Sequence, residues 1–374
     1  MDSCTFQPHS PAGPKVGREF VTHLEKSMEL ALGTEPLPGY YSFEQSAAAR
    51  KLLEEIMMVR PGEDVAITVD TAGDWRAAMA TAQAAYALGA RPSLLLYQTQ
   101  CEAQMEPPGP VAGAVARADV WIEYAIAYIL YTEARRSATR AGCRYACLAG
   151  IDVDALVRLI GRVDYARLLA LGDELVRLIR GAREIRITSA QGTDLVGRLA
   201  GEVSQSGGLA KERGATVMVG GQVGHLPAED SLHGRIVVDG EIWPPAEIGI
   251  LREPVQLTIE KGSIREVRGG AAAAAFRQWL ANWNDPNMYR MAHYAYGFNP
   301  GAAKLSGRIV EDERVFGAIT FGFGATSDRP APTHSDCIVL RPSIFLDGVE
   351  IERDGKYVHP RLVDLCRQMR VPGY

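Results

Sequence analysis

The sequence lacks an excess of positive charge, a long apolar run and a pattern of paired cysteines. Its 45 acidic residues outnumber its 40 basic ones, so a net charge of -5 gives no electrostatic basis for binding nucleic acid or an anionic membrane. One apolar segment, residues 120–131, is too short to span a bilayer and contains Glu123. The first residues show no charged segment followed by an apolar one. We therefore expect a cytoplasmic protein without nucleic-acid or membrane partners.

Common zinc and dinucleotide fingerprints are also missing. Six cysteines are scattered along the chain, and only Cys143 and Cys147 lie close together. A C-x3-C pair with no second pair or nearby histidine is a weak zinc signal, and reduced thiols explain it more simply. No G-x-G-x-x-G follows the first predicted strand, so the sequence gives no dinucleotide-binding loop.

The composition is that of a folded protein with two domains. Hydrophobic residues make up 47% of the 374 positions and charged residues 23%, and this length exceeds one ordinary domain. Residues 1–17 form a polar, proline-containing leader that we expect to be disordered. We place an N-terminal domain at residues 18–150, a bridging helix at 151–182 and a C-terminal domain at 183–374.

The N-terminal domain is predicted to be a small parallel α/β sheet. A helical pattern leads to an apolar strand at residues 65–69, followed by an alanine-rich helix that Gly89 ends. Further strands are expected at 92–97 and 118–123. Strand, helix and strand within ~30 residues form a βαβ unit, whose strands lie parallel.

The C-terminal domain is predicted to be largely antiparallel β structure that carries a metal site. Short alternating runs are separated by Asp-Gly and Lys-Gly turn dipeptides, and one helix at 271–283 interrupts them. The expected strands include residues 184–188, 195–199, 216–219, 235–238 and 255–259. The overall fold class is therefore α/β plus β.

Three residues of this domain are candidate metal ligands. His334 and Asp336 stand two positions apart at the start of an apolar strand, so both side chains should project from one face. His293 lies in the segment M-A-H-Y-A-Y-G-F-N-P, whose glycine and Asn-Pro-Gly turn indicate a special backbone path. Two histidines and one carboxylate form a facial triad that suits non-haem iron(II), whereas thiolates would favour zinc. The alternative is that His293 is a core histidine and that His334 and Asp336 are surface polar residues.

A second polar cluster supplies candidate catalytic groups. The segment H-L-P-A-E-D-S-L-H holds His225, Glu229, Asp230 and His233 within nine residues. They are predicted to be acid–base groups near the substrate, with a solvated polar loop as the equally weighted alternative. The remaining histidines, His9, His23 and His359, are most simply surface residues.

Several segments together resemble the thermophilic metallo-aminopeptidases, also called aminopeptidase T. The resemblance runs from about residue 59 to the C-terminus, and the joint order of its motifs is more specific than any one of them. The matching segments are V-R-P-G-E-D-V-A-I-T-V-D at 59–70, A-A-Y-A-L-G-A-R-P at 84–92, S-A-Q-G-T-D-L at 189–195, H-L-P-A-E-D at 225–230, Y-G-F-N-P-G-A at 296–302 and H-S-D at 334–336.

Departures from the peptidase pattern decide the expected function. The peptidases hold two metals, and a glutamate ligand stands where this sequence has His293. Ala318 falls where a further histidine ligand is expected, no tyrosine follows, and Glu229 or Asp230 takes the place of the first glutamate. A two-metal peptidase site is therefore incomplete.

The remaining His293, His334 and Asp336 are similar to the other branch of this superfamily, the 2,5-dihydroxypyridine 5,6-dioxygenases of nicotinate and nicotine catabolism. That resemblance implies one iron(II) on a two-histidine, one-aspartate triad, and extradiol-type ring cleavage of 2,5-dihydroxypyridine by dioxygen to N-formylmaleamic acid. Tyr294 and Tyr296 are predicted to bind substrate, although packing explains at least one of them. Related enzymes are homo-oligomers, so we expect a homo-oligomer here.

Two other classes of function stay open at this stage. One is a zinc hydrolase, either a metallo-aminopeptidase or an amide hydrolase, in which Glu229, Asp230 and Glu313 supply carboxylates. The other is a non-catalytic member that keeps the fold and binds a ligand or partner. The identity of the bound metal would distinguish a zinc hydrolase from a dioxygenase. Whether any metal binds would distinguish a non-catalytic member from both. The aromatic substrate itself is not fixed by the sequence.

Overall fold

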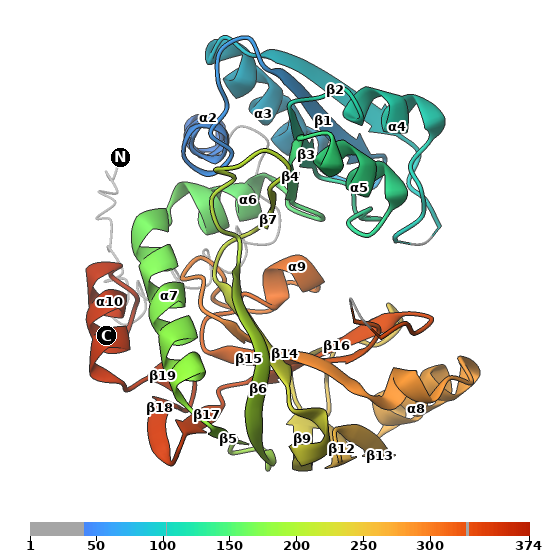
Figure 1. The fold of residues 1–374 in the computed structure, drawn as a ribbon, viewed down its shortest axis with the longest axis vertical. Coiled ribbons are helices and arrows are strands. Elements are labelled where there is room, and N and C mark those ends of the chain that lie inside the picture. The colour runs from blue at the N-terminus through green and yellow to red at the C-terminus, as the bar shows by residue number, and fades with distance from the viewer. Residues whose placement is uncertain (1–40, 102, 327–328) are drawn as a thin grey trace, which may run out of the picture. The chain divides into compact units, whose positions relative to one another are not determined.

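The computed structural model describes residues 41–101, 103–326 and 329–374 (Figure 1). The predicted leader at 1–17, with the start of the predicted N-terminal domain, His9 and His23, lies outside the described residues. Residues 43–374 form one compact unit. The domain boundaries near residues 150 and 183 therefore stay predictions.

A five-stranded parallel sheet confirms the predicted α/β part of the fold. Its strand order is β2-β1-β3-β4-β7, and every neighbouring pair is parallel. The strands are β1 (Asp64–Asp70), β2 (Arg91–Tyr97), β3 (Val120–Glu123), β4 (Arg144–Cys147) and β7 (Thr216–Met218). The helical elements of this part of the chain are α2 (Ser42–Lys51), η1 (Leu52–Ile56), α3 (Trp75–Ala87), α4 (Gly109–Val115), α5 (Glu133–Arg140), α6 (Val153–Leu156), η2 (Val157–Gly161) and α7 (Tyr165–Gly181).

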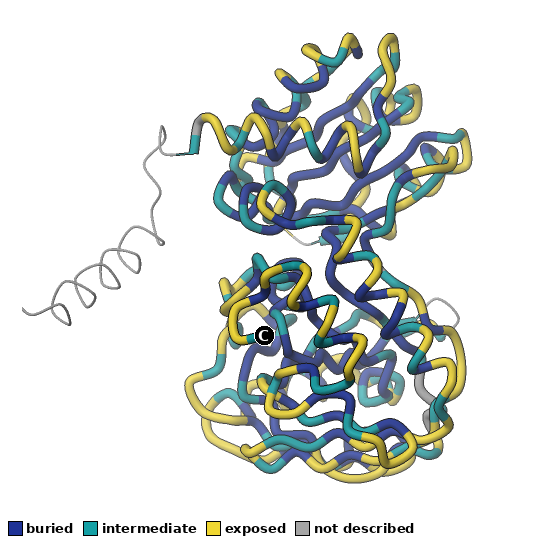
Figure 2. Tube along the Cα trace, turned by 90° about the vertical axis from the view of Figure 1, so that its left-hand side faces the viewer, coloured by how far each residue is buried: buried dark blue, intermediate teal, exposed yellow. Residues whose placement is uncertain are grey.

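Local sequence explains why α3 forms and packs closely on this sheet. Asp74 caps the helix by accepting a hydrogen bond from the Arg76 amide, and Gly89 follows its last turn with φ of +78°. The buried positions of α3 are alanines and one threonine, so the helix axis can approach the strands. Strand β1 is accordingly buried along nearly its whole length. Figure 2 shows the buried segments of the chain in dark blue.

Strand β7 corrects one prediction. Residues 216–219 were expected in the antiparallel domain, but β7 pairs in parallel with β4 and forms the fifth strand of the first sheet. The reason is that an alternating pattern specifies a strand and its buried face, whereas its partner depends on which sheet edge is free.

A fourteen-stranded antiparallel sheet confirms the second part of the predicted fold. Its main path is β11-β10-β16-β15-β14-β8-β6-β5-β17-β18-β19, and β12 pairs with β13 and β9, which also pairs with β6. The strands are β5 (Glu184–Thr188), β6 (Asp194–Ser206), β8 (Gln222–Pro227), β9 (His233–Val238), β10 (Glu241–Trp243), β11 (Gly249–Ile250), β12 (Val255–Glu260), β13 (Ser263–Arg268), β14 (Met291–Gly297), β15 (Ala318–Gly324), β16 (His334–Leu340), β17 (Ser343–Leu346), β18 (Val349–Arg353) and β19 (Lys356–Tyr357). The helical elements here are η3 (Glu229–Ser231), α8 (Ala271–Asn282), η4 (Pro286–Tyr289), α9 (Ile309–Asp312) and α10 (Pro360–Gln368).

The central strands of this sheet have one face of large side chains and one of small side chains. Along β15, Ile319, Phe321 and Phe323 alternate with Thr320 and two glycines. Since alternate residues of a strand face opposite ways, the aromatic rings fill the core on one face and leave the other face open. We call the face that carries Thr320 the small-residue face. It is the face on which the candidate metal centre lies.

A membrane-spanning helix is not found in the described part of the chain: no helix there has both the length and the apolar character required.

Candidate metal centre

Three neighbouring strands bring the predicted ligands together. His293 lies on β14, and His334 and Asp336 lie on β16, with β15 between them. In the register of the sheet, Gly322 of β15 stands opposite both His293 and Asp336. Residues directly opposite in antiparallel strands project from the same face, so all three side chains stand on the small-residue face.

The three ligand atoms form a compact triangle. His293 Nε2 and His334 Nε2 are 3.1 Å apart, and Asp336 Oδ1 lies 3.2 Å from His334 Nε2 and 3.4 Å from His293 Nε2. An ion with ligand bonds of ~2.1 Å would space such atoms by ~3.0 Å at right angles and by ~3.4 Å in a tetrahedron. The triangle therefore fits one transition-metal ion of either geometry.

Gly322 provides the space that this triangle occupies. A Cβ atom added at Gly322 would lie 2.5 Å from His293 Nε2 and 2.7 Å from His334 Nε2. Any larger residue would thus enter the volume between the two imidazoles. The glycine is required by the close approach of the ligands to the backbone of β15, since its φ lies outside the left-handed region.

Hydrogen bonding orients His334, and charge interactions keep Asp336 ionised, so both favour binding of a cation. His334 Nδ1 lies 2.9 Å from the Ala325 carbonyl oxygen, which fixes a tautomer whose Nε2 lone pair faces the other ligands. Burial opposes ionisation of Asp336, but the two imidazoles hold the pKa of its carboxyl well below the ordinary value. Side-chain exposures of 26% for His293, 29% for His334 and 13% for Asp336 leave the centre accessible.

Within residues 41–101, 103–326 and 329–374, this is the one group of three or more His, Cys, Asp or Glu ligand atoms that lie within 4.8 Å of one another. A second metal cluster of the peptidase kind is not formed by those residues.

Glu313 is a carboxyl group that faces this centre. Its charge interacts with Asp336 and His293, and Gln222 and Arg314 hydrogen-bond to it, the latter at 2.7 Å. Burial and then Asp336 raise the pKa of Glu313. Gln222 stands opposite Gly297 of β14, and therefore lies on the small-residue face. The sequence named Glu313 only as an alternative metal ligand and did not single out Gln222.

Glu241 is a second carboxyl group near the centre, and the sequence gave no signal for it. It is fully buried on β10, and burial followed by the neighbouring Asp312 raises its pKa to about 9. Asp312 accepts hydrogen bonds from the amides of Ser306 and Gly307.

Aromatic side chains from the segment after β3 and from β10 lie near the candidate metal centre. Tyr128 and Tyr131 belong to the segment that follows β3, at the carboxyl end of the parallel sheet. Burial and then Asp336 raise the pKa of the Tyr128 hydroxyl, and the charges of Asp336 and Glu313 also act on the Tyr131 hydroxyl. The Tyr128 ring lies 6.2 Å from that of Trp243, which ends β10. The carboxyl ends of parallel strands commonly build binding sites.

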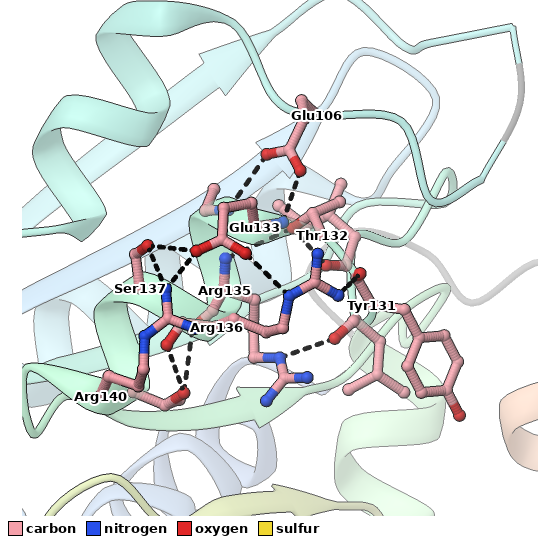
Figure 3. A network of polar contacts seen from close by, with 12 residues as sticks. Glu106, Tyr131, Thr132, Glu133, Arg135, Arg136, Ser137 and Arg140 are labelled. Carbon is pink, nitrogen blue, oxygen red and sulfur yellow. Dashed lines mark hydrogen bonds and ion pairs between the residues drawn. The ribbon is translucent and has the colours of Figure 1, made fainter. Parts of the chain in front are cut away.

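A polar network holds the segment that carries Tyr131 (Figure 3). Glu106 accepts hydrogen bonds from the first amides of α5, those of Glu133 and Ala134. The Tyr131 carbonyl accepts a hydrogen bond of 2.5 Å from Arg136. The ring of Tyr131 projects away from this network, and the residue is 65% exposed. The backbone is thus fixed while the phenol stays accessible.

The predicted acid–base residues lie elsewhere in the described structure. His225 faces away from the triad, because its register neighbour Tyr294 lies on the aromatic face, with the two rings 4.9 Å apart. Burial lowers the pKa of His225 to about 4. Asp230 and His233 are exposed, and the side chain of Glu229 lies outside the described part. The structure does not bring His225, Asp230 or His233 to the triad.

The predicted substrate-binding tyrosines also point to the aromatic face. Tyr294 and Tyr296 are fully buried, and their hydroxyls have no hydrogen-bond partner among the described residues. Strand alternation is the reason, since His293 and Ala295 occupy the intervening positions that face the triad. A packing role, the alternative raised from the sequence, agrees with this placement.

Comparison with known proteins gives one consistent result. A sequence model of the family described as NicX, 2,5-dihydroxypyridine 5,6-dioxygenase, matches residues 46–359. A 2,5-dihydroxypyridine 5,6-dioxygenase of Pseudomonas putida is 26% identical over 247 residues, which are 62% of this chain and 69% of that protein.

Solved structures show the same fold. The structure of 2,5-dihydroxypyridine dioxygenase from Pseudomonas putida matches with a TM-score of 0.69 at 21% identity, covering 86% of this chain and 98% of that one. AmpT from Thermus thermophilus matches with a TM-score of 0.63 at 15% identity, covering 85% and 100%. Because the family match spans most of the sequence, this chain belongs to the 2,5-dihydroxypyridine 5,6-dioxygenase family.

Proposed function

We propose that this protein is a mononuclear non-haem iron(II) dioxygenase that opens the ring of 2,5-dihydroxypyridine, or of a similar hydroxylated aromatic, to an N-formylmaleamate-type product. The observation that carries the proposal is the His293, His334 and Asp336 triangle in a chain of this family. Two imidazoles and one carboxylate are the donor set of iron(II) oxygenases, and they occupy only one side of an ion. When bound, iron(II) supplies the redox chemistry between dioxygen and the ring.

The surrounding residues support a role in binding a phenolic substrate. The charge interactions of Glu313 with Asp336 and His293 support a role for it in accepting the hydroxyl proton that must leave before an electron-rich ring reacts. Gln222 and Arg314 orient its carboxylate by hydrogen bonding. We assign this proton-accepting role to Glu313 rather than to His225, Asp230 or His233, because their side chains do not approach the triad.

A metallo-aminopeptidase or related zinc hydrolase is the second candidate. The likeness to AmpT supports the fold that such an enzyme would need, and the ligand triangle also has the dimensions of a tetrahedral zinc site. The single cluster of ligand atoms in the described residues favours one metal and therefore the first proposal.

Metal content and dioxygen uptake separate the two. Protein purified without oxygen and loaded with iron(II) should hold one iron per chain and consume dioxygen when 2,5-dihydroxypyridine is added. His334→Ala should abolish both, since it removes a ligand that the Ala325 carbonyl orients. His359→Ala, which changes a histidine next to α10 and away from the triad, serves as the matched control. Two zinc ions per chain with peptide hydrolysis and no dioxygen uptake would overturn the proposal.

A further inference from the structure

Trp243 stands beside the candidate metal centre in the sheet. It pairs directly with Asp336 across the antiparallel strands β10 and β16. Directly opposed residues project from the same face, so the indole and the Asp336 carboxylate lie next to each other on the small-residue face. Trp243 is half-buried, which leaves part of its ring available to a ligand at the triad.

The backbone on both sides of Trp243 is anchored to the strand that carries Asp336. Ser335 Oγ donates a hydrogen bond of 2.5 Å to the carbonyl oxygen of Pro244, the residue after Trp243. The adjacent pair, Ile242 and Cys337, is fully buried on the other face of the sheet. Both neighbours of Trp243 are therefore anchored to β16, which keeps the backbone of Trp243 beside that of Asp336.

Tyr128 contacts this ring from the segment after β3. The two ring centroids are 6.2 Å apart and the planes are inclined by 40°. Gln104 hydrogen-bonds to the Tyr128 side chain, and the backbone N–H of Gln104 donates a hydrogen bond of 2.7 Å to the Tyr128 carbonyl oxygen. Gln104 thus contacts both the side chain and the backbone of this tyrosine. We call Tyr128 and Trp243 the aromatic wall.

The floor beside the aromatic wall is flat and weakly polar. Gly322, Thr320 and Ala295 lie on the small-residue face next to the triad, and none carries a bulky side chain. Thr320 Oγ1 is buried and has no hydrogen-bond partner among the described residues. A flat floor with an aromatic side suits a planar ring, since offset or edge-to-face aromatic pairs have centroids ~4.5–7 Å apart.

We propose that Trp243, supported by Tyr128, is a specificity-determining residue that holds the planar ring of the substrate against the aromatic wall. This inference deepens the proposed function and rests on it: the site takes a single flat hydroxylated aromatic ring rather than a peptide chain. Stacking acts on the bound ring before and during the reaction, so its loss weakens binding more than turnover.

Tryptophan fluorescence and kinetics test the inference together. The protein loaded with iron(II) is titrated with 2,5-dihydroxypyridine under anaerobic conditions, so that binding is measured without turnover. Wild-type protein should show quenching that Trp243→Phe loses and Trp283→Phe keeps. Trp283, at the end of α8 and 41% exposed, is the matched control. In air, Trp243→Ala should raise KM ~3–10-fold with little change in kcat, as expected for an aromatic pair.

The outcomes separate this inference from the proposed function. Dioxygen uptake by the wild type with unchanged quenching in Trp243→Phe, or an unchanged KM in Trp243→Ala, would overturn the aromatic wall and leave the dioxygenase proposal intact. Quenching that depends on Trp243 without dioxygen uptake would support the aromatic wall and refute the dioxygenase. If neither Trp243-dependent quenching nor dioxygen uptake is observed, the aromatic wall and the dioxygenase proposal are both overturned. Trp243→Phe keeps an aromatic ring and so guards against a variant that merely fails to fold.

Discussion

Gly322→Ala should remove metal binding without unfolding the protein. The added methyl group would lie 2.5 Å from His293 Nε2 and 2.7 Å from His334 Nε2. Ordinary contacts of carbon begin near ~3.5 Å, so each imidazole must move by about 1 Å. A shift of that size breaks a ligand triangle whose sides are 3.1–3.4 Å.

The expected loss of metal affinity is at least ~10–100-fold, the range seen when residues that orient metal ligands are replaced. Stability should change little, by less than ~1 kcal/mol, because alanine can adopt the backbone of Gly322 and restricts the unfolded chain. Competition with a chromogenic chelator measures the affinity, and a urea titration measures the stability.

Gly224→Ala is the matched control for this experiment. Gly224 of β8 lies on the same face, opposite Ala295, and a Cβ there would have no atom within 4 Å. Metal affinity should therefore equal that of the wild type. Equal affinity in Gly322→Ala itself would refute the ligand arrangement derived from the sheet register.

Three further variants probe the surrounding structure. Glu313→Gln should lower kcat at least ~10-fold and leave iron content unchanged, as steady-state kinetics and metal analysis can show. Burial raises the pKa of Glu123 from its ordinary 4.5 to about 8, so the folded protein binds this proton more tightly than the unfolded chain does. The free energy of unfolding should therefore fall as pH rises between these two values. Urea titrations at pH 5 and pH 8 should show a smaller fall for Glu123→Gln than for the wild type. Glu106→Ala removes the acceptor for two amides of α5, and thermal unfolding should report a loss of ~0.5–2 kcal/mol.

The sequence predicted the elements of the fold and the grouping of the candidate metal ligands because both leave local patterns. His334 and Asp336 are two residues apart on one strand, so their common face followed from spacing alone. The βαβ unit was likewise visible in residues 65–97, and the structure confirms it as β1, α3 and β2.

Features that depend on strand pairing were not predictable in the same way. Trp243 reaches Asp336 only because β10 happens to pair with β16, and no local pattern records that choice. The same limit explains why β7 was placed in the wrong sheet. The orientation of Tyr294 and Tyr296, by contrast, was available from alternation once His293 was taken as a ligand.

The alternation A-I-T-F-G-F-G at residues 318–324 was a further signal. Small residues at every second position of a strand leave one face open, and the triad stands on that face. Applied to the sequence, this pattern indicates the floor of the site before any pairing is known.

The central claim is that one iron ion at His293, His334 and Asp336 supports insertion of dioxygen into an aromatic ring. Turnover of 2,5-dihydroxypyridine under isotopically labelled dioxygen, followed by mass spectrometry of the product, tests it most directly. The account predicts that both atoms of the labelled dioxygen appear in the ring-opened product. A product that takes its oxygen from water, or an unaltered ring, would contradict it.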